Sequence, residues 1–195
     1  EAVTREQRLQ EGDFLPFAAG WAQPRDGYLH WLAGHEQQGA MFRQAEVKAK
    51  QPLGDLELIG TIDRIDGISS TGEPTVLVID YKTGSDSVTR QRIQSGAEDT
   101  QLPFYAALLH HDTLRAAYVN VGERGETQLH EQDEVVHLRD VLIEGIQHDM
   151  ARIAAGAPLP ALGEGSVCDF CAVRGLCRKD YWADAEQVLP APETP

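Results

Sequence analysis

Long apolar runs and an export leader are both missing from this sequence. Its 195 residues contain no stretch of about 18 or more apolar residues, which excludes a membrane-spanning helix. No basic segment followed by an apolar one opens the chain, so we expect a cytoplasmic protein without a membrane partner. The first residue is Glu1 rather than Met, and we therefore expect the chain to be part of a longer polypeptide.

Positive charge is also scarce. Lys and Arg number 17 against 31 Asp and Glu, which gives a formal net charge of −14 at pH 7. This balance excludes a protein that coats nucleic acid, because such proteins bind phosphates mainly through Lys and Arg. It does not exclude an enzyme whose carboxylates hold a divalent metal, because the ion reverses the local field. Other parts of the parent protein would then have to supply most of the affinity for DNA.

Cysteine is limited to three residues, Cys168, Cys171 and Cys177, which lie close together in the sequence. An odd and clustered set is a poor framework for disulfides. In an intracellular protein, this spacing indicates ligation of a metal ion or a cluster.

The remaining pattern predicts an α/β (α+β) fold with a central mixed sheet flanked by helices. Strands are predicted at residues 57–66, 75–83 and 114–121, with a short fourth strand at 134–138. Residues 1–45 predict two helical segments separated around residues 20–27, and an amphipathic helix is predicted at 139–155. A further helix, capped by Asp99 or Thr100, should run to about His111, and residues 84–98 predict a mobile polar loop.

These elements suggest four parts of the chain. Residues 1–45 form an N-terminal helical segment, residues 46–156 the core, and residues 157–188 a cysteine-containing segment. The Pro-rich tail at 189–195 is predicted to be disordered.

Two carboxylates and a lysine mark the hairpin formed by the first two predicted strands. Side chains alternate along a strand, so Asp80 and Lys82 point to the same face. The midpoint between Asp63 and Asp80 falls between Thr71 and Gly72, inside the turn predicted at residues 67–74, which places the two carboxylates nearly opposite each other. Their Cβ atoms would lie about 4.5–5.5 Å apart.

Two carboxylates in this position repel each other, and a divalent cation such as Mg²⁺ or Mn²⁺ would remove the repulsion. Lys82 beside them can hold a water molecule or stabilise phosphoryl charge, so the set suits phosphodiester hydrolysis. The alternative is that Asp63 and Asp80 merely end strands and pair with Arg64 or Lys82. Asp66 falls on the opposite face, where we expect a structural turn cap.

Three motifs in order resemble the nuclease domain of the RecB and AddB family, which belongs to the PD-(D/E)XK class. They are Gly60-Thr-Ile-Asp63-Arg64-Ile-Asp66, Val78-Ile-Asp80-Tyr81-Lys82-Thr-Gly84 and Gln101-Leu-Pro-Phe-Tyr105. The resemblance covers about Glu46 to Trp182 and implies a restriction-endonuclease-like core.

The resemblance also implies roles for single residues. Asp63 and Asp80 would bind the metal, Lys82 would assist the attacking water, and Gln101 and Tyr105 would support the site and the DNA backbone. Tyr105 could instead be a core aromatic residue. Glu46 matches a family glutamate and is a further candidate metal ligand, with an exposed glutamate at the start of a strand as the alternative.

The cysteines resemble the last three ligands of the iron–sulfur motif in AddB-type nucleases. A 4Fe-4S cluster is held by four thiolates, and the family's fourth cysteine and its active-site histidine both lie upstream. This chain has no upstream cysteine, and nothing around His30 or His35 matches the histidine motif. The resemblance therefore implies a cluster only in the full-length parent. Zinc with an added histidine, or a loop of free thiols, is the alternative.

As a whole, the resemblance implies a Mg²⁺- or Mn²⁺-dependent deoxyribonuclease, an exonuclease rather than an endonuclease, that is weak or inactive as this chain alone. It would act on DNA with a helicase subunit or domain, in double-strand break processing and recombinational repair. The alternatives are a nuclease-like module that only binds DNA or a helicase, and a structural metal-binding domain. The presence of Asp63, Asp80 and Lys82 together favours the enzyme.

Overall fold

A computed structural model of the protein describes residues 19–69, 74–94, 96, 99–109, 111–157, 168 and 171–177. The chain divides into two units, Glu1–His148 and Asp149–Pro195. The sheet and the residues that the hairpin motifs single out lie in the first unit. The predicted disordered tail at 189–195 and most of the cysteine segment lie outside the described residues.

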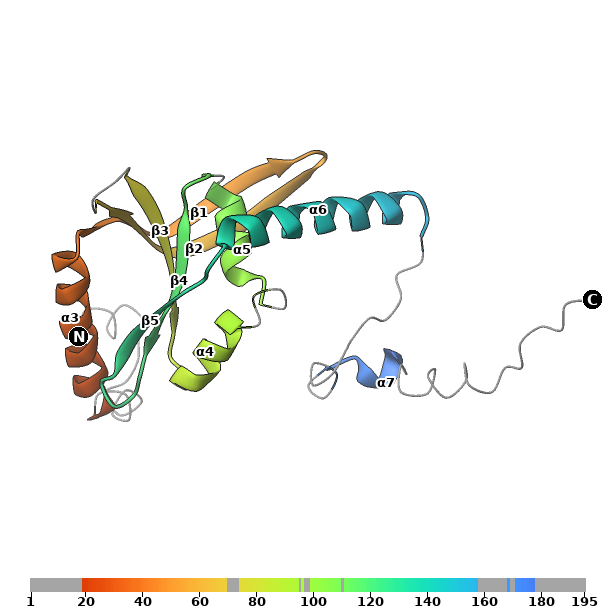
Figure 1. Ribbon diagram of the computed structural model, residues 1–195. Helices are drawn as coiled ribbons and strands as arrows, with labels where there is room; N and C mark the ends of the chain where they lie inside the picture. The colour runs from red at the N-terminus through yellow and green to blue at the C-terminus, as the bar shows by residue number, and fades with distance from the viewer. Residues whose placement is uncertain are drawn as a thin grey trace, which may run out of the picture. The chain divides into compact units, whose positions relative to one another are not determined.

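A mixed five-stranded sheet forms the centre of the first unit, with the order β1-β2-β3-β4-β5 (Figure 1). All neighbouring strands are antiparallel except β3 and β4, which run parallel. The predicted mixed sheet is thus confirmed. The strands are β1 (Ala40–Leu53), β2 (Leu56–Ile68), β3 (Thr75–Lys82), β4 (Arg115–Val121) and β5 (Thr127–Glu131).

Helices cover both faces of the sheet (Figure 1). Helix α3 (Ala22–Gln37) lies on one face, where Trp31 packs against a small core that includes Leu77 and Ile79. Helices α4 (Asp86–Gln94), α5 (Gln101–Leu109) and the start of α6 (Val135–Ala154) lie on the other. The larger core is on this second face, and its fully buried side chains include Val78 of the sheet and Leu102 and Ala106 of α5. Because side chains alternate along a strand, β3 supplies residues to both cores.

The N-terminal part differs from the sequence prediction. Strand β1 begins at Ala40, so residues 40–45 are not helical. Most side chains of this edge strand are exposed, and its sequence therefore lacks the alternation of a half-buried strand. A bend at Trp21 separates the helical residues 19–20 from α3, so a break does lie within the expected stretch 20–27, but the chain is helical again from Ala22. Gly27 lies inside α3 and faces the turn after β4. A Cβ at this position would lie 1.8 Å from the carbonyl oxygen of Gly125, so only glycine fits there.

Two further elements were predicted wrongly. Residues 86–94 form α4 rather than a mobile loop, and only one of its residues, Thr89, is buried. A helix without an apolar face has no sequence signal of the kind that predicts helices. The fourth strand of the prediction lies at Thr127–Glu131 instead of 134–138, where α6 begins. Gly125, at φ 88°, makes the turn that brings β5 back beside β4.

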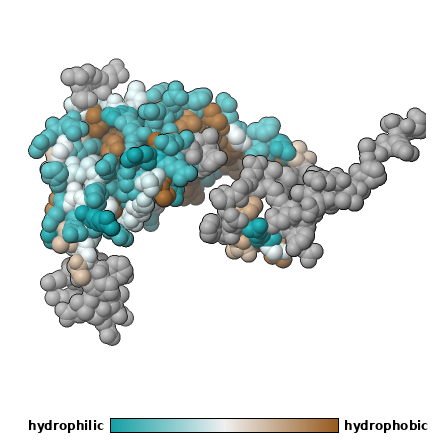
Figure 2. All heavy atoms as spheres, turned by 60° about the horizontal axis from the view of Figure 1, so that its bottom comes forward, coloured by the Kyte–Doolittle hydropathy of each residue, from teal (hydrophilic) through white to brown (hydrophobic). Residues whose placement is uncertain are grey.

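Hydrophilic residues prevail on the face shown in Figure 2, with apolar side chains gathered in a few places. None of the helices in the described part of the chain combines the length and the apolar character that crossing a membrane requires. In the second unit, the short helix α7 (Arg174–Cys177) follows Cys168 and Cys171.

Candidate active site

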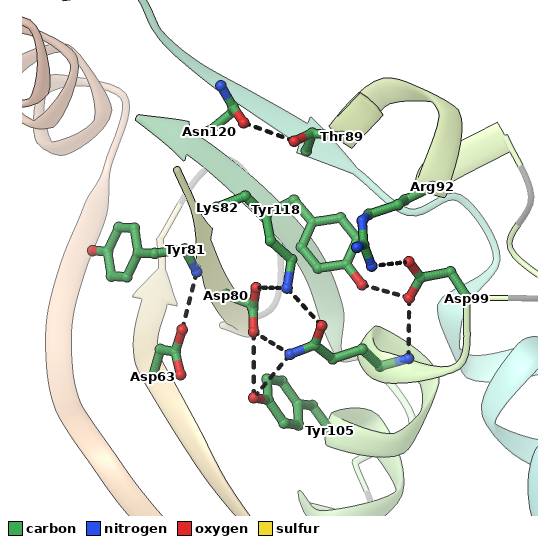
Figure 3. A network of polar contacts seen from close by, with 11 residues as sticks. Asp63, Asp80, Tyr81, Lys82, Thr89, Arg92, Asp99, Tyr105, Tyr118 and Asn120 are labelled. Carbon is green, nitrogen blue, oxygen red and sulfur yellow. Dashed lines mark hydrogen bonds and ion pairs between the residues drawn. The ribbon is translucent and has the colours of Figure 1, made fainter. Parts of the chain in front are cut away.

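The β2–β3 register brings Asp63 and Asp80 together. The ladder ends with Ile65 opposite Val78 and Arg64 opposite Ile79, so one more step places Asp63 opposite Asp80. At this point Asp63 Oδ2 accepts a hydrogen bond of 3.0 Å from the backbone N–H of Tyr81 (Figure 3). The register therefore agrees with the opposition expected from the symmetry of the hairpin.

Asp80 is nearly fully buried, with 2% of its surface exposed. Its Oδ1 accepts hydrogen bonds from Gln101 Nε2 and from the hydroxyl of Tyr105, the latter at 3.3 Å. Its Oδ2 forms an ion pair with Lys82 Nζ at 2.7 Å and has no other partner among the described residues. Burial raises the pKa of Asp80 and the nearby Asp63 carboxylate adds to the shift, whereas contact with Lys82 and Tyr105 opposes it.

The ammonium of Lys82 is held from three directions (Figure 3). Besides the ion pair with Asp80, Nζ donates a hydrogen bond of 2.6 Å to Gln101 Oε1. It also lies 4.8 Å from the centre of the Tyr118 ring, within the range of a cation–π contact. As predicted for residues two apart on a strand, Asp80 and Lys82 share a face. The charge of Lys82 therefore stands beside the two carboxylates.

Gln101 and Tyr105 meet on one face of α5, as their spacing of four predicts. Gln101 Nε2 lies 3.3 Å from the Tyr105 hydroxyl, and both side chains contact Asp80. Burial raises the pKa of Tyr105, and the carboxylates of Asp80 and Asp63 raise it further. Tyr105 therefore stays protonated at neutral pH and can donate a hydrogen bond to Asp80.

Glu46 lies on β1 and is exposed. The residues on either side of it in β1 pair with Arg64 and Ile62 of β2, so the register places Glu46 opposite Asp63. Its φ of 52° is unusual for a residue other than glycine, and such outliers gather at functional sites. Even so, within the described part of the chain no group of three or more His, Cys, Asp or Glu lies close enough together to hold a metal ion. The structure does not bring Glu46 into a ligand set with Asp63 and Asp80.

The residues present fit a hard divalent cation. Asp80 Oδ2 is buried and contacts only the Lys82 ammonium among the described residues, and Asp63 uses only one of its oxygens in the contact with Tyr81. Two carboxylates that face each other have the oxygen chemistry that Mg²⁺ and Mn²⁺ prefer, and such sites often keep several water ligands.

A second buried polar cluster lies behind the hairpin, and sequence analysis did not predict it. Asp66 is fully buried inside β2, where it accepts a hydrogen bond of 2.8 Å from Arg64 Nε and lies 3.0 Å from His35 Nε2. It is therefore not the turn cap that we expected. Burial acts to raise the pKa of Asp66, but the hydrogen bonds with His35 and Arg64 outweigh it and lower the pKa.

The same cluster joins α3 to the back of the hairpin. Arg64 Nη1 donates to the hydroxyl of Tyr28 at 3.1 Å, and this hydroxyl lies 2.9 Å from that of Tyr81. Tyr81 stands between Asp80 and Lys82, so α3 supports the strand that carries both. No local pattern could reveal this contact, because it depends on how α3 packs.

The three cysteines do not assemble a metal site among the described residues. Cys168, Cys171 and Cys177 are free, and the backbone N–H of Cys171 donates to the carbonyl of Cys168 at 3.3 Å. The 4Fe-4S cluster stays a prediction.

Comparison with known proteins gave one match to a family model and several to solved structures. The model described as PD-(D/E)XK nuclease superfamily matches residues 2–178. The crystal structure of SSO0001 is 14% identical over 88% of this chain and 73% of its own, with a TM-score of 0.38. That of a proposed exonuclease from Eubacterium rectale is 12% identical over 83% of this chain and 57% of its own, with a TM-score of 0.35. No curated protein matches the sequence.

Proposed function

We propose that this chain, which belongs to the PD-(D/E)XK nuclease superfamily, is a metal-dependent deoxyribonuclease domain that cleaves phosphodiester bonds at Asp63, Asp80 and Lys82. The restriction-endonuclease-like fold of the superfamily agrees with the mixed sheet and its flanking helices. The observation that carries the proposal is the buried Asp80 carboxylate. It faces Asp63, and the ammonium of Lys82 is the one partner of its Oδ2 among the described residues.

In the proposed mechanism, Asp63 and Asp80 would hold the cation. When bound, a divalent cation lowers the pKa of a coordinated water and screens the charge on the phosphate. Lys82 orients the attacking water or stabilises the developing phosphoryl charge through its ammonium group. Gln101 and Tyr105 donate hydrogen bonds to Asp80 Oδ1, which keeps Oδ2 facing Lys82, where it would serve as a metal ligand. Glu46 would contribute a further ligand, directly or through water, by a change of its side-chain position.

We further propose that the parent is a RecB- or AddB-like protein that acts in the cytoplasm on double-strand breaks during recombinational repair. The order of the three motifs and the cysteine spacing support this assignment. A helicase subunit or domain would deliver the DNA, because a chain with a net charge of −14 has little attraction for phosphates of its own. Exonuclease activity with Mg²⁺ or Mn²⁺ is the proposed specificity, and the parent would complete the 4Fe-4S ligand set.

The test is cleavage of linear and of covalently closed DNA by the parent protein, with Mg²⁺ or Mn²⁺ and then with a chelator. Lys82→Ala should lower activity on linear DNA by about two or more orders of magnitude. Lys50→Ala is the matched control, because it removes an exposed lysine of β1 whose one ion pair among the described residues is with Glu57, near the β1–β2 turn. Binding of DNA without metal-dependent cleavage would instead indicate the binding module.

A further inference from the structure

A carboxylate outside the three motifs joins two of the supports of Lys82 (Figure 3). Asp99 precedes α5, and its Oδ1 accepts a hydrogen bond of 2.7 Å from the Tyr118 hydroxyl. The same oxygen lies 3.3 Å from the backbone N of Gln101, which donates to it. Sequence analysis predicted Asp99 only as a possible helix cap, and it did not single out Tyr118.

Two partners of Asp99, Tyr118 and Gln101, also touch Lys82 from outside its own strand. Gln101 accepts the hydrogen bond of Nζ, and the Tyr118 ring lies beneath the ammonium. Tyr118 pairs with Asp80 across the parallel β3–β4 ladder, so its ring occupies the same face of the sheet. Asp99 thus connects the support from α5 with the support from β4.

The burial of Tyr118 and the charge balance at Asp99 both favour a fixed geometry for this connection. Tyr118 is 1% exposed, and burial together with its hydrogen bond to Asp99 raises the pKa of its hydroxyl, which therefore remains a donor. Arg92 of α4 donates to Asp99 Oδ2 at 2.9 Å and balances the charge of this carboxylate. Asp99 therefore has partners for both oxygens and holds Tyr118 and Gln101 without attracting Lys82 away from Asp80.

We propose that Asp99 and Tyr118 are positioning residues, which hold the Lys82 ammonium and the Gln101 side chain at Asp80. The inference rests on the proposed nuclease function. A lysine has a flexible four-carbon stem and a point charge, so it occupies one place only where several partners surround it. Displacement of a catalytic group by about 1 Å can lower a rate about a hundredfold.

The test uses Tyr118→Phe in the parent protein, because this change removes the hydroxyl and keeps the ring. Without the hydrogen bond from the residue 118 side chain to Asp99, kcat should fall about 10- to 100-fold, while KM changes little. This is the range seen for residues that orient the ligands of a metal site. Mn²⁺ affinity should be retained, because Asp63 and Asp80 are unaltered. Asp99→Ala should lower kcat at least as far, and Asp99→Asn should recover much of the loss, since its amide oxygen still accepts from Tyr118 and Gln101.

Thr89→Val is the matched control. Thr89 Oγ1 donates to Asn120 at 2.7 Å in a buried hydrogen bond between α4 and β4. Asn120 is the ladder neighbour of Lys82, but among the described residues neither Thr89 nor Asn120 forms a side-chain hydrogen bond with Lys82 or Gln101. A merely structural role would give Tyr118→Phe and Thr89→Val similar losses in melting temperature and the same kcat, and this result would overturn the inference.

A crystal structure of Tyr118→Phe with Mn²⁺ gives a readout that does not depend on activity. We expect Lys82 Nζ to leave its position 2.6 Å from Gln101 Oε1, and an unchanged contact would overturn the inference. If the proposed nuclease function itself were wrong, the observations would be different. The parent would then not cleave DNA, and Lys82→Ala would equal the wild type, whatever the position of Lys82 in the Tyr118→Phe structure.

Discussion

Asp63 is anchored by the backbone of Tyr81, the residue between Asp80 and Lys82. Asp63 Oδ2 accepts the Tyr81 N–H at 3.0 Å, one step beyond the last pair of the β2–β3 ladder. A side-chain oxygen thus satisfies a backbone donor that the ladder leaves behind, as buried backbone groups require. The contact holds one carboxylate in place opposite the other before any cation binds, and it leaves Oδ1 of Asp63 available as a ligand.

Mn²⁺ should bind at the two carboxylates and stabilise the fold. At a free Mn²⁺ concentration 100 times the Kd, the stabilisation should be about 2.7 kcal/mol, provided the unfolded chain does not bind the ion. Calorimetric titration and thermal unfolding would measure both effects. Asp80→Ala should abolish them, whereas Asp55→Ala, in the turn between β1 and β2, should not. Equal binding by wild type and Asp80→Ala would remove the proposed site.

Ionisation of Asp80 and ionisation of Asp66 should change the stability of the metal-free fold in opposite directions. The pKa of Asp80 is raised above the ordinary Asp value of 3.8, so ionised Asp80 destabilises the fold, fully so above its folded pKa. The pKa of Asp66 is lowered, so ionised Asp66 stabilises the fold above pH 3.8, and this contribution disappears as the pH falls through the folded pKa.

At pH 7, Asp80→Asn should therefore raise the melting temperature of the metal-free protein. Asp66→Asn should lower stability by about 2 kcal/mol, since it weakens hydrogen bonds to Arg64 and His35. Thermal unfolding in the presence of a chelator would compare the two variants, which differ in the same atom at equally buried positions. A loss of stability in Asp80→Asn would contradict the expected sign.

Gly27→Ala should destabilise the protein, because its Cβ would overlap the carbonyl of Gly125 at 1.8 Å. We expect a loss of about 1–3 kcal/mol, as for overpacked sites. Gly34→Ala, in the same helix with no atom within 4 Å of the added Cβ, should gain up to about 1 kcal/mol. Denaturant unfolding would measure both, and equal stability of the two variants would show that α3 does not approach the β4–β5 turn.

The 195-residue chain, purified without oxygen, should be colourless. Cys168, Cys171 and Cys177 supply three thiolates, and the sequence has no other cysteine to complete a 4Fe-4S set. An absorbance spectrum and an iron assay would decide the matter. Stoichiometric iron with an absorbance band at about 400 nm, as thiolate–iron clusters show, would mean that a ligand other than cysteine completes the site.

The geometry of the β2–β3 hairpin could be predicted from the sequence because it is local. Alternation along β3 places Asp80 and Lys82 on one face, and the symmetry of a hairpin sets Asp63 opposite Asp80. The helical spacing of Gln101 and Tyr105 likewise required no knowledge of the rest of the fold. Periodicity and turn residues were sufficient for these relationships, since each involves neighbours within one element or across one turn.

Contacts between distant segments were decided by the tertiary structure. His35 and Asp66 meet because α3 packs behind the hairpin, and Asp99 reaches Tyr118 because α5 begins beside β4. Strand β1 and helix α4 escaped prediction because each exposes most of its side chains, so that neither has a strong apolar pattern. The sequence by itself determined which side chains could bind a cation, since that depends on residue type and local spacing. Only packing determined what holds them in place, because the partners come from separate elements of the sequence.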